Sequence, residues 1–307
     1  MKLTFAIPCY RSANTIAGVV REIAAKMAEK PDLDWEIVAV NDCSPDGVLA
    51  VLETLAASEP RLKVVDCAIN RGKHAALMAA YANATGDIVV GVDDDGQCPL
   101  DRLWDLVAPL AQGFDMAMAH YGKRQQRGLK AFGSRVNDWM ARLLIGRPKN
   151  LTFSNFTARK KWLCDELAQY TNPYPYLEGL TLRITKNIAT VPMDERPRAA
   201  GRSNFTFKRS LMLWLNGFTA FSVVPLRMAS FAGFLFSFAG FVFALSIVVR
   251  KLLHPEMSAG YASMMATTLF LGGVILLSLG LLGEYIGRIY ICINKSPQYV
   301  VRRKINC

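Results

Sequence analysis

Residues 87–97 read DIVVGVDDDGQ, an apolar run that ends in three consecutive aspartates. The β-branched residues of 87–92 predict a buried strand. Three carboxylates at a strand end repel one another, and a divalent cation would relieve that repulsion. Asp95 and Gln97 offer the hard oxygen ligands that Mg²⁺ or Mn²⁺ accepts, with substrate phosphate oxygens in the remaining positions. A solvated acidic turn that caps the next helix, with Asp101 near its start, is the alternative.

The chain before this stretch alternates between apolar runs and helix-like segments. Strands are predicted at residues 3–9, 35–40, 62–65 and 87–92, with one helix ending near 28 and others over 48–57 and 74–83. Strands that alternate with helices at this spacing predict an α/β fold with a mostly parallel sheet and helices on both faces. Ligands bind beyond the carboxyl ends of the strands in such sheets, so the polar segments there are the candidate sites.

Two polar loops follow neighbouring predicted strands. Pro8 and Tyr10 lie at the end of the first strand, and Asn41 and Asp42 at the end of the second. Adjacent parallel strands would bring these loops together, so that the Tyr10 ring lies against a base while Asp42 accepts a base N–H. A turn with the composition of residues 43–47, CSPDG, would look similar without a ligand.

A third polar segment, NRGKHA at residues 70–75, opens a predicted helix. Free backbone N–H groups and the ammonium of Lys73 would favour an anion there. Neither G-x-x-x-x-G-K-[ST] nor G-x-G-x-x-G occurs in the sequence, which disfavours a nucleoside triphosphatase and a dinucleotide-dependent dehydrogenase.

The composition excludes several classes of protein. The 307 residues are 52% hydrophobic and 20% charged, with a net charge of +11 and a mean hydropathy of +0.20. These values rule out a disordered chain, a disulfide-stapled mini-domain and a collagen-like fibre. The seven cysteines are scattered without a C-x-x-C pair, so the sequence supports neither a disulfide framework nor a zinc site.

The apolar excess lies after residue 227, in two uncharged runs at 228–249 and 257–283. Each reaches the roughly 20 residues that a helix needs to cross a bilayer. We therefore predict two transmembrane helices over 228–283 with a short periplasmic connector; a pair of buried core helices is the alternative. Basic residues are more numerous on the outer flanks than in the connector, which predicts that both termini are cytoplasmic.

The remaining segments follow from that topology. Residues 1–205 are predicted to form a cytosolic domain, because the first residues do not have the pattern of a signal peptide. Residues 206–227 mix aromatic, leucine and basic side chains as an interfacial amphipathic helix does. Residues 284–307 are predicted to be a cytosolic juxtamembrane helix with a basic tail.

Basic residues gather in the middle of the chain and before the apolar runs; they include Lys123, Arg124, Lys130, Arg198 and Arg202. They lack the interleaved aromatic residues that stack on bases, so nucleic acid is not a predicted partner. Anionic membrane lipids and a lipid phosphate are the nearer partners. A merely membrane-adhesive role for each of these charges stays open.

Six stretches carry a family resemblance: IPCYRSANTI (7–16), EIVAVNDCSPDG (36–47), NRGKHAAL (70–77), VDDDGQCP (92–99), SNF (154–156) and RAAGRSN (198–204). With the two apolar runs behind them, they closely resemble glycosyltransferase family 2, and within it the polyprenyl-phosphate glycosyltransferases of the dolichol-phosphate mannose synthase and undecaprenyl-phosphate aminoarabinose-type group. The resemblance implies a GT-A, Rossmann-like domain on the cytoplasmic face of a bacterial inner membrane. It also implies metal-dependent transfer of a sugar from a nucleotide sugar, with UDP the expected nucleotide, to undecaprenyl phosphate with inversion, for cell-envelope glycan or lipid modification. Similar proteins suggest a homotetramer.

The motifs and the resemblance together assign roles to individual residues. The expected nucleotide-binding residues are Pro8, Tyr10, Asp42, Lys73, Asp93 and Asp94, and the expected ligands of Mg²⁺ or Mn²⁺ are Asp95 and Gln97. Catalysis is assigned to Asp93, Asp95, Lys123 and Arg124. The lipid phosphate is assigned to Lys130, Ser134, Arg198 and Arg202.

Three asparagines depart from the family pattern. Asn41 replaces the first acid of the usual acidic pair, Asn204 replaces a final lysine, and Asn155 stands where some relatives have an acid. No carboxylate base is therefore expected at position 155. A polyprenyl phosphate oxygen is already anionic near neutral pH, so the nucleophile needs positioning more than deprotonation.

Two other functions are alternatives to this one. A processive polysaccharide synthase of the same superfamily would carry a Q-x-x-R-W segment, and none of the five tryptophans is preceded by it. A catalytically silent membrane protein that binds polyprenyl phosphate would not need the intact Asp93, Asp95 and Gln97. Metal-dependent release of nucleoside diphosphate would distinguish the silent protein from an enzyme.

Overall fold

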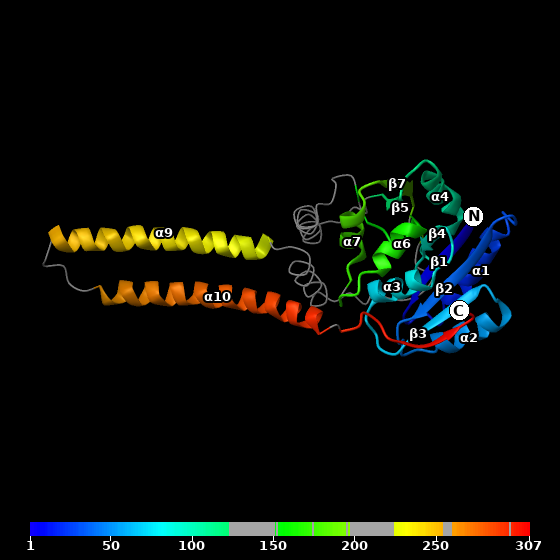
Figure 1. The fold of residues 1–307 in the computed structure, drawn as a ribbon, viewed down its shortest axis with the longest axis horizontal. Coiled ribbons are helices and arrows are strands. Elements are labelled where there is room, and N and C mark those ends of the chain that lie inside the picture. The colour runs from blue at the N-terminus through cyan, green and yellow to red at the C-terminus, as the bar shows by residue number, and fades with distance from the viewer. Residues whose placement is uncertain are drawn as a thin grey trace. The chain divides into compact units, whose positions relative to one another are not determined.

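A computed structural model of the chain describes residues 1–122, 151, 153–173, 175–194, 196, 224–253, 260–294 and 296–307. The chain divides into two compact units (Figure 1). One consists of Met1–Asn204 together with Lys295–Cys307, and the other of Phe205–Asn294. Both termini therefore belong to the same unit.

The first unit is built on an eight-stranded sheet in the order β7-β5-β6-β4-β1-β2-β3-β8. Its strands are β1 (Lys2–Cys9), β2 (Asp34–Asn41), β3 (Leu62–Cys67), β4 (Ile88–Gly91), β5 (Met116–Tyr121), β6 (Thr157–Lys160), β7 (Ile188–Met193) and β8 (Val301–Ile305). The central strands β3, β2, β1 and β4 are parallel, as is β5 to β7, whereas β6 and β8 run antiparallel to their neighbours. The predicted α/β fold with a mostly parallel central sheet is confirmed.

Helices cover both faces of this sheet. They are α1 (Ile16–Met27), α2 (Val48–Ser58), α3 (Lys73–Asn83), η1 (Leu100–Arg102), α4 (Leu103–Ala111), α6 (Lys161–Ala168) and α7 (Leu177–Ile184). Successive side chains of a strand point to opposite faces, so Phe5 packs in the core with α1, α2 and α4 while Ala6 packs in the core with α3, α6 and α7. The β-branched and aliphatic runs recognised in the sequence fill these two cores.

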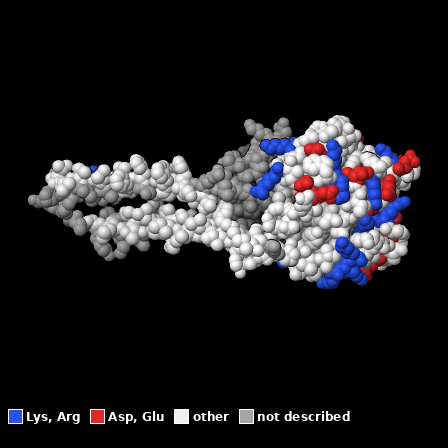
Figure 2. Space-filling view, viewed as in Figure 1, with Lys and Arg blue, Asp and Glu red and all other residues white. Residues whose placement is uncertain are grey.

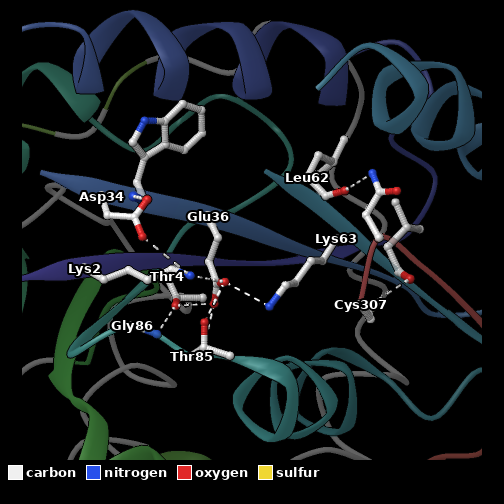
Figure 3. Close-up of polar contacts among 12 residues, drawn as sticks. Lys2, Thr4, Asp34, Glu36, Leu62, Lys63, Thr85, Gly86 and Cys307 are labelled. Carbon is white, nitrogen blue, oxygen red and sulfur yellow. Dashed lines mark hydrogen bonds and ion pairs between the residues drawn. The ribbon is translucent and has the colours of Figure 1, made fainter. Parts of the chain in front are cut away.

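A buried carboxylate, Glu36, lies within β2 and ties three elements together (Figure 3). Its side chain is 3% exposed, and the ammonium groups of Lys2 and Lys63 approach its Oε2 at 2.9 Å each. Its Oε1 accepts hydrogen bonds from Thr4 Oγ1 at 2.8 Å and Thr85 N–H at 2.7 Å, and its Oε2 accepts one from Thr85 Oγ1 at 2.7 Å. Burial alone would raise the pKa of Glu36, but these donors outweigh it and lower the pKa to about 2.

Gly86 provides a test of the close packing of the loop before β4 on β1. A Cβ at Gly86 would lie 2.8 Å from Lys2 O, Thr4 N and Thr4 Oγ1, so the backbone would have to move. We expect Gly86→Ala to destabilise the protein by about 1–3 kcal/mol, as overpacking does. The control is Gly18→Ala in α1, where nothing lies within 4 Å of the new Cβ, and it should be neutral or stabilise by about 0.5–1 kcal/mol. Equal denaturation midpoints for the two variants would contradict the packing at Gly86.

The C-terminal residues, predicted to be a basic tail, contain a strand. Val301–Ile305 form the edge strand β8, antiparallel to β3, with Val301 and Ile305 more buried than the three basic residues between them. Asn306 Nδ2 donates to Ala56 O at 2.9 Å and Leu62 O at 3.1 Å, which fixes the end of the chain. The basic residues are therefore exposed on an edge strand, and the backbone of this strand pairs with an edge that β3 would otherwise leave open.

The second unit contains α9 (Val224–Leu253) and α10 (Tyr261–Ile293). The two helices lie side by side as an antiparallel hairpin (Figure 1), and Phe236 and Phe270 pack edge to face with ring centroids 5.5 Å apart. Lys, Arg, Asp and Glu gather on the α/β unit, whereas α9 and α10 present almost only uncharged residues in this view (Figure 2).

The membrane segments differ in part from those predicted. Within the described part of the chain one segment, Phe270–Ile293, is long and apolar enough to cross a membrane by length and composition, and Ala229–Phe243 is apolar but shorter. Two transmembrane helices are thus not confirmed. Residues 284–293 continue α10, so the predicted juxtamembrane helix is not separate from the second apolar helix. Residues 206–223 of the predicted interfacial helix lie outside the described residues, and 224–227 belong to α9.

Candidate active site

The polar loops predicted to meet at the carboxyl ends of the strands lie together. In the sheet Cys9 is paired with Asn41, and Ala6 with Gly91, so the ends of β1, β2 and β4 are neighbours. Tyr10 N–H donates to Asp94 Oδ2 at 2.9 Å, a direct link between the loops after β1 and β4. Pro8 is a buried residue of β1 itself. The carboxyl edge of the parallel strands is therefore the candidate site.

Lys73, Asp93 and Asn155 converge from three separate motifs. Lys73 Nζ forms an ion pair with Asp93 Oδ1, and Asn155 Nδ2 donates to Asp93 Oδ2 at 2.7 Å. Lys73 is the first residue of α3, where backbone N–H groups add positive potential. The lysine thus offsets one of the three adjacent carboxylates, and Asn155 acts as a donor to Asp93.

Asp94 faces the loop after β1. In addition to its bond from Tyr10, its backbone carbonyl accepts a hydrogen bond from Thr15 Oγ1 at 2.6 Å. Burial raises the pKa of Asp94, and the hydrogen bond from Tyr10 N–H only partly offsets the rise. Asp94 therefore positions the Tyr10 backbone, while the Tyr10 side chain is 44% exposed with the Arg11 guanidinium 5.5 Å from its ring centroid.

Asp95 and Gln97 lie in one tight turn beside Asp93. Gly96 has φ +75°, a left-handed conformation that favours glycine, and Asp95 Oδ1 accepts a hydrogen bond from Gln97 N–H at 3.1 Å. Gln97 Nε2 donates to Arg196 O at 3.1 Å. Among the described residues no group of three or more His, Cys, Asp or Glu side chains could hold a metal ion. A carboxylate and an amide oxygen fit Mg²⁺ or Mn²⁺ when a substrate supplies phosphate oxygens, because such ions bind through one or two protein groups.

Asp42 is buried and organises the loop before α3. Its Oδ1 accepts Arg71 N–H at 2.9 Å and its Oδ2 accepts Gly72 N–H at 2.8 Å, and Asn70 Nδ2 donates to its backbone carbonyl at 3.0 Å. Burial raises the pKa of Asp42 above its ordinary value, because the two N–H donors lower it by less than burial raises it. Each carboxylate oxygen retains a second lone pair that is available to a base N–H. This role of Asp42 stays a prediction.

Asn41 has a structural reason to be an amide. Its Nδ2 donates to Asp66 Oδ1 at 2.7 Å, and its Oδ1 accepts Ser44 N–H at 3.1 Å. A carboxylate at position 41 would have no N–H to donate and would repel the carboxylate of Asp66, which is 2% exposed. In the sequence, Asp66 is a single acid in an apolar run, and no local pattern identifies Asn41 as its partner.

Six predicted residues lie outside the described part of the chain: Lys123, Arg124, Lys130, Ser134, Arg198 and Arg202. Their roles stay predictions. No sequence pattern singles out Arg196, yet it contacts the turn that carries Gln97. No local pattern connects two residues so far apart in the chain.

The carboxylate turn and the lysine lie at the carboxyl edge of the parallel strands, which is where α/β sheets of this kind bind their ligands. Residues 4–163 match the family model described as glycosyl transferase family 2, and residues 224–289 match that of the GtrB C-terminal hairpin. Because the first match spans more than half of the chain, the protein belongs to glycosyltransferase family 2.

Similar proteins match over nearly the whole chain. The SfII prophage-derived bactoprenol glucosyl transferase of Shigella flexneri is 28% identical over 306 residues, which cover 99% of this chain and 98% of that protein. The undecaprenyl-phosphate 4-deoxy-4-formamido-L-arabinose transferase of Enterobacter sp. (strain 638) is 28% identical over 309 residues, with 99% and 94% covered.

Solved structures share the fold at low sequence identity. Mannosyl-3-phosphoglycerate synthase from Rubrobacter xylanophilus has a TM-score of 0.55 and 18% identity, with 74% of each chain covered. Glucosyl-3-phosphoglycerate synthase from Mycobacterium tuberculosis, in complex with Mn²⁺, UDP-glucose and phosphoglyceric acid, has a TM-score of 0.51 and 20% identity, with 71% of this chain and 77% of that chain covered. These likenesses concern the fold.

Proposed function

We propose that the protein transfers a sugar from a nucleoside diphosphate, UDP being the expected nucleotide, to undecaprenyl or another polyprenyl phosphate. The observation that carries the proposal is the convergence of Lys73, Asp93 and the Asp95–Gln97 turn at the carboxyl edge of the parallel strands. The acceptor class is supported by the two relatives, whose names specify bactoprenol and undecaprenyl phosphate.

The nucleotide would lie across the ends of β1, β2 and β4. The exposed Tyr10 ring is available for stacking on a base, and Asp42 lies at the end of the adjacent strand. The diphosphate would meet the positive start of α3, where Lys73 stands. The Asp94 carboxylate is already bonded to Tyr10 N–H, so its part in nucleotide binding is to position that loop.

Asp95 and Gln97 would hold Mg²⁺ or Mn²⁺. The ion would supply positive charge to the departing diphosphate. Lys73 adds a cationic group beside this turn, where its ammonium pairs with the Asp93 carboxylate. The protein's contribution is therefore fixed charge where negative charge develops on the leaving group.

Transfer does not need a carboxylate base at position 155. A lipid phosphate oxygen attacks the anomeric carbon as the bond from that carbon to the diphosphate breaks, so UDP leaves and the configuration inverts. The nucleophile is already an anion, and Asn155 bonds to Asp93 without taking a proton. The chain's task is to orient the phosphate, a role proposed for Lys130, Ser134, Arg198 and Arg202, and Lys123 or Arg124 would lie near the diphosphate.

The C-terminal hairpin would place this reaction at a bacterial plasma membrane. The segment Phe270–Ile293 is apolar enough to span it, and α9 is proposed as the second span. The positive-inside rule puts the catalytic unit on the cytoplasmic side, where nucleotide sugars are made. Residues 206–227 as an interfacial helix, and a homotetramer, belong to the same proposal.

The proposed function predicts a lipid-linked sugar as the product. Purified full-length protein, given a panel of radiolabelled UDP-sugars with undecaprenyl phosphate and Mn²⁺, should form a glycosyl-phosphoundecaprenol that mass spectrometry identifies, together with one equivalent of UDP. Elongated glycan instead would favour a processive synthase. Binding of undecaprenyl phosphate without UDP release from any donor would favour the silent binding protein.

A further inference from the structure

Arg196, three residues beyond β7, pairs with the turn that carries Gln97. Its backbone N–H donates to Gln97 O at 3.3 Å, and its carbonyl accepts Gln97 Nε2–H at 3.1 Å. Because a carbonyl only accepts, the amide nitrogen of Gln97 must face Arg196. The Oε1 atom of the same planar amide therefore points away from the Arg196 carbonyl.

The guanidinium of Arg196 anchors this backbone pairing to two further elements. Its Nη1 lies 2.6 Å from Glu22 Oε1 on α1, and its Nη2 forms an ion pair with Asp101 on η1. A planar fork suits two carboxylates at once, which a lysine ammonium does not match. The Arg196 carbonyl is therefore held by contacts that join α1, η1 and the 95–97 turn.

The Arg196 side chain is exposed enough that its removal should change the position of Gln97 without a large change in fold stability. Its side chain is 35% exposed, and ion pairs of that kind contribute little to the free energy of unfolding. Within the turn, Asp95 accepts the Gln97 backbone N–H, whereas the Gln97 side-chain amide donates to the Arg196 carbonyl. Loss of the guanidinium should thus affect Gln97 more than it affects the fold.

We propose that Arg196 is a positioning residue that orients the Gln97 side-chain oxygen for the divalent cation of the transfer reaction. The proposal rests on the proposed function, which places that cation at Asp95 and Gln97. Supporting groups of this kind fix the orientation of a ligand and change metal affinity by about 10–100-fold when removed.

The test is a Mn²⁺ titration of the full-length protein with UDP present, followed by electron paramagnetic resonance. Arg196→Gln should raise the Kd for Mn²⁺ by about 10–100-fold, and Arg196→Lys should give an intermediate Kd. The matched control is Arg303→Gln, which breaks another arginine–carboxylate pair, with Glu53 on α2, and should bind Mn²⁺ as the wild type does. Unfolding midpoints of all three variants should remain close to that of the wild type.

Two further experiments make the result decisive. Glu22→Gln and Asp101→Asn leave Arg196 in place and should each weaken Mn²⁺ binding, which tests the anchor even if Arg196→Gln folds poorly. In a Gln97→Ala background, Arg196→Gln should cause no additional loss. Equal Mn²⁺ affinity for the wild type, Arg196→Gln and both anchor variants would overturn the role of Arg196 and leave the proposed function intact. A wild type that binds no Mn²⁺ with UDP would overturn both.

Discussion

Asp95→Asn is expected to reduce sugar transfer by about 10²–10³-fold or more, the cost typical of removing one preorganised group that stabilises developing charge. Asparagine has nearly the same shape but no negative charge, so it is a weaker ligand for a divalent cation. The effect should appear in kcat with the acceptor saturating, because the lost interaction acts on the departing diphosphate. Initial rates of UDP release and of lipid product, measured on the purified full-length protein, would check it.

The fold should not suffer from this change. Asp95 neighbours Asp93 and Asp94, so removing its charge relieves repulsion among three carboxylates. The denaturation midpoint of Asp95→Asn should equal or exceed that of the wild type. The control is Asp105→Asn, which removes an exposed carboxylate paired with Arg102 on η1 and should retain the wild-type rate. Near wild-type transfer by Asp95→Asn would contradict the assigned metal site.

Glu36→Gln is expected to cause a large loss of stability, because it removes a buried carboxylate that two ammonium groups share. The pKa of Glu36 falls from its ordinary value of 4.5 to about 2 in the folded protein. At 1.36 kcal/mol per pKa unit this corresponds to about 3 kcal/mol. Glutamine would also leave the ammonium groups of Lys2 and Lys63 without their shared anion. Denaturant unfolding of the full-length protein in detergent would measure the loss.

The same residue sets a pH dependence with a defined sign. Because its folded pKa is depressed, the contribution of Glu36 is fully present above about pH 4.5 and is lost as the pH falls towards 2. The difference in stability between the wild type and Glu36→Gln should therefore shrink over that interval. The control Asp34→Asn removes an exposed carboxylate 3.8 Å from the same Lys2 ammonium and should cost less than about 1 kcal/mol. A difference that is constant down to pH 2 would show that Glu36 acts through packing alone.

The central part of the fold could be predicted because its signals are local. Apolar runs such as 35–40 and 87–92, each followed by turn residues, indicate buried strands, and their alternation with helices implies a parallel sheet. The strands β6 and β8 could not be predicted in the same way. Each is short and carries basic residues, and β8 pairs with β3 more than 200 residues earlier in the chain. Such pairing depends on the completed sheet.

The candidate site could likewise be predicted only in part. Its location followed from the topology, since polar loops after parallel strands meet at one edge, and Lys73, Asp93 and Asp95 lie there. The partners of individual side chains did not follow. The pairing of Asn41 with Asp66, and of Gln97 with Arg196, depends on register and side-chain rotamers that no short sequence pattern encodes. The hairpin was predicted from composition, which specifies apolar length better than helix ends.

The most direct measurement is the anomalous scattering of Mn²⁺ in crystals of the full-length protein grown with UDP. One strong peak is expected at coordination distance from both an Asp95 carboxylate oxygen and Gln97 Oε1, with the diphosphate completing the ion's ligands and the base beside Tyr10. A peak bound to other protein groups, or ordered UDP at the carboxyl edge with no metal at this turn, would contradict it.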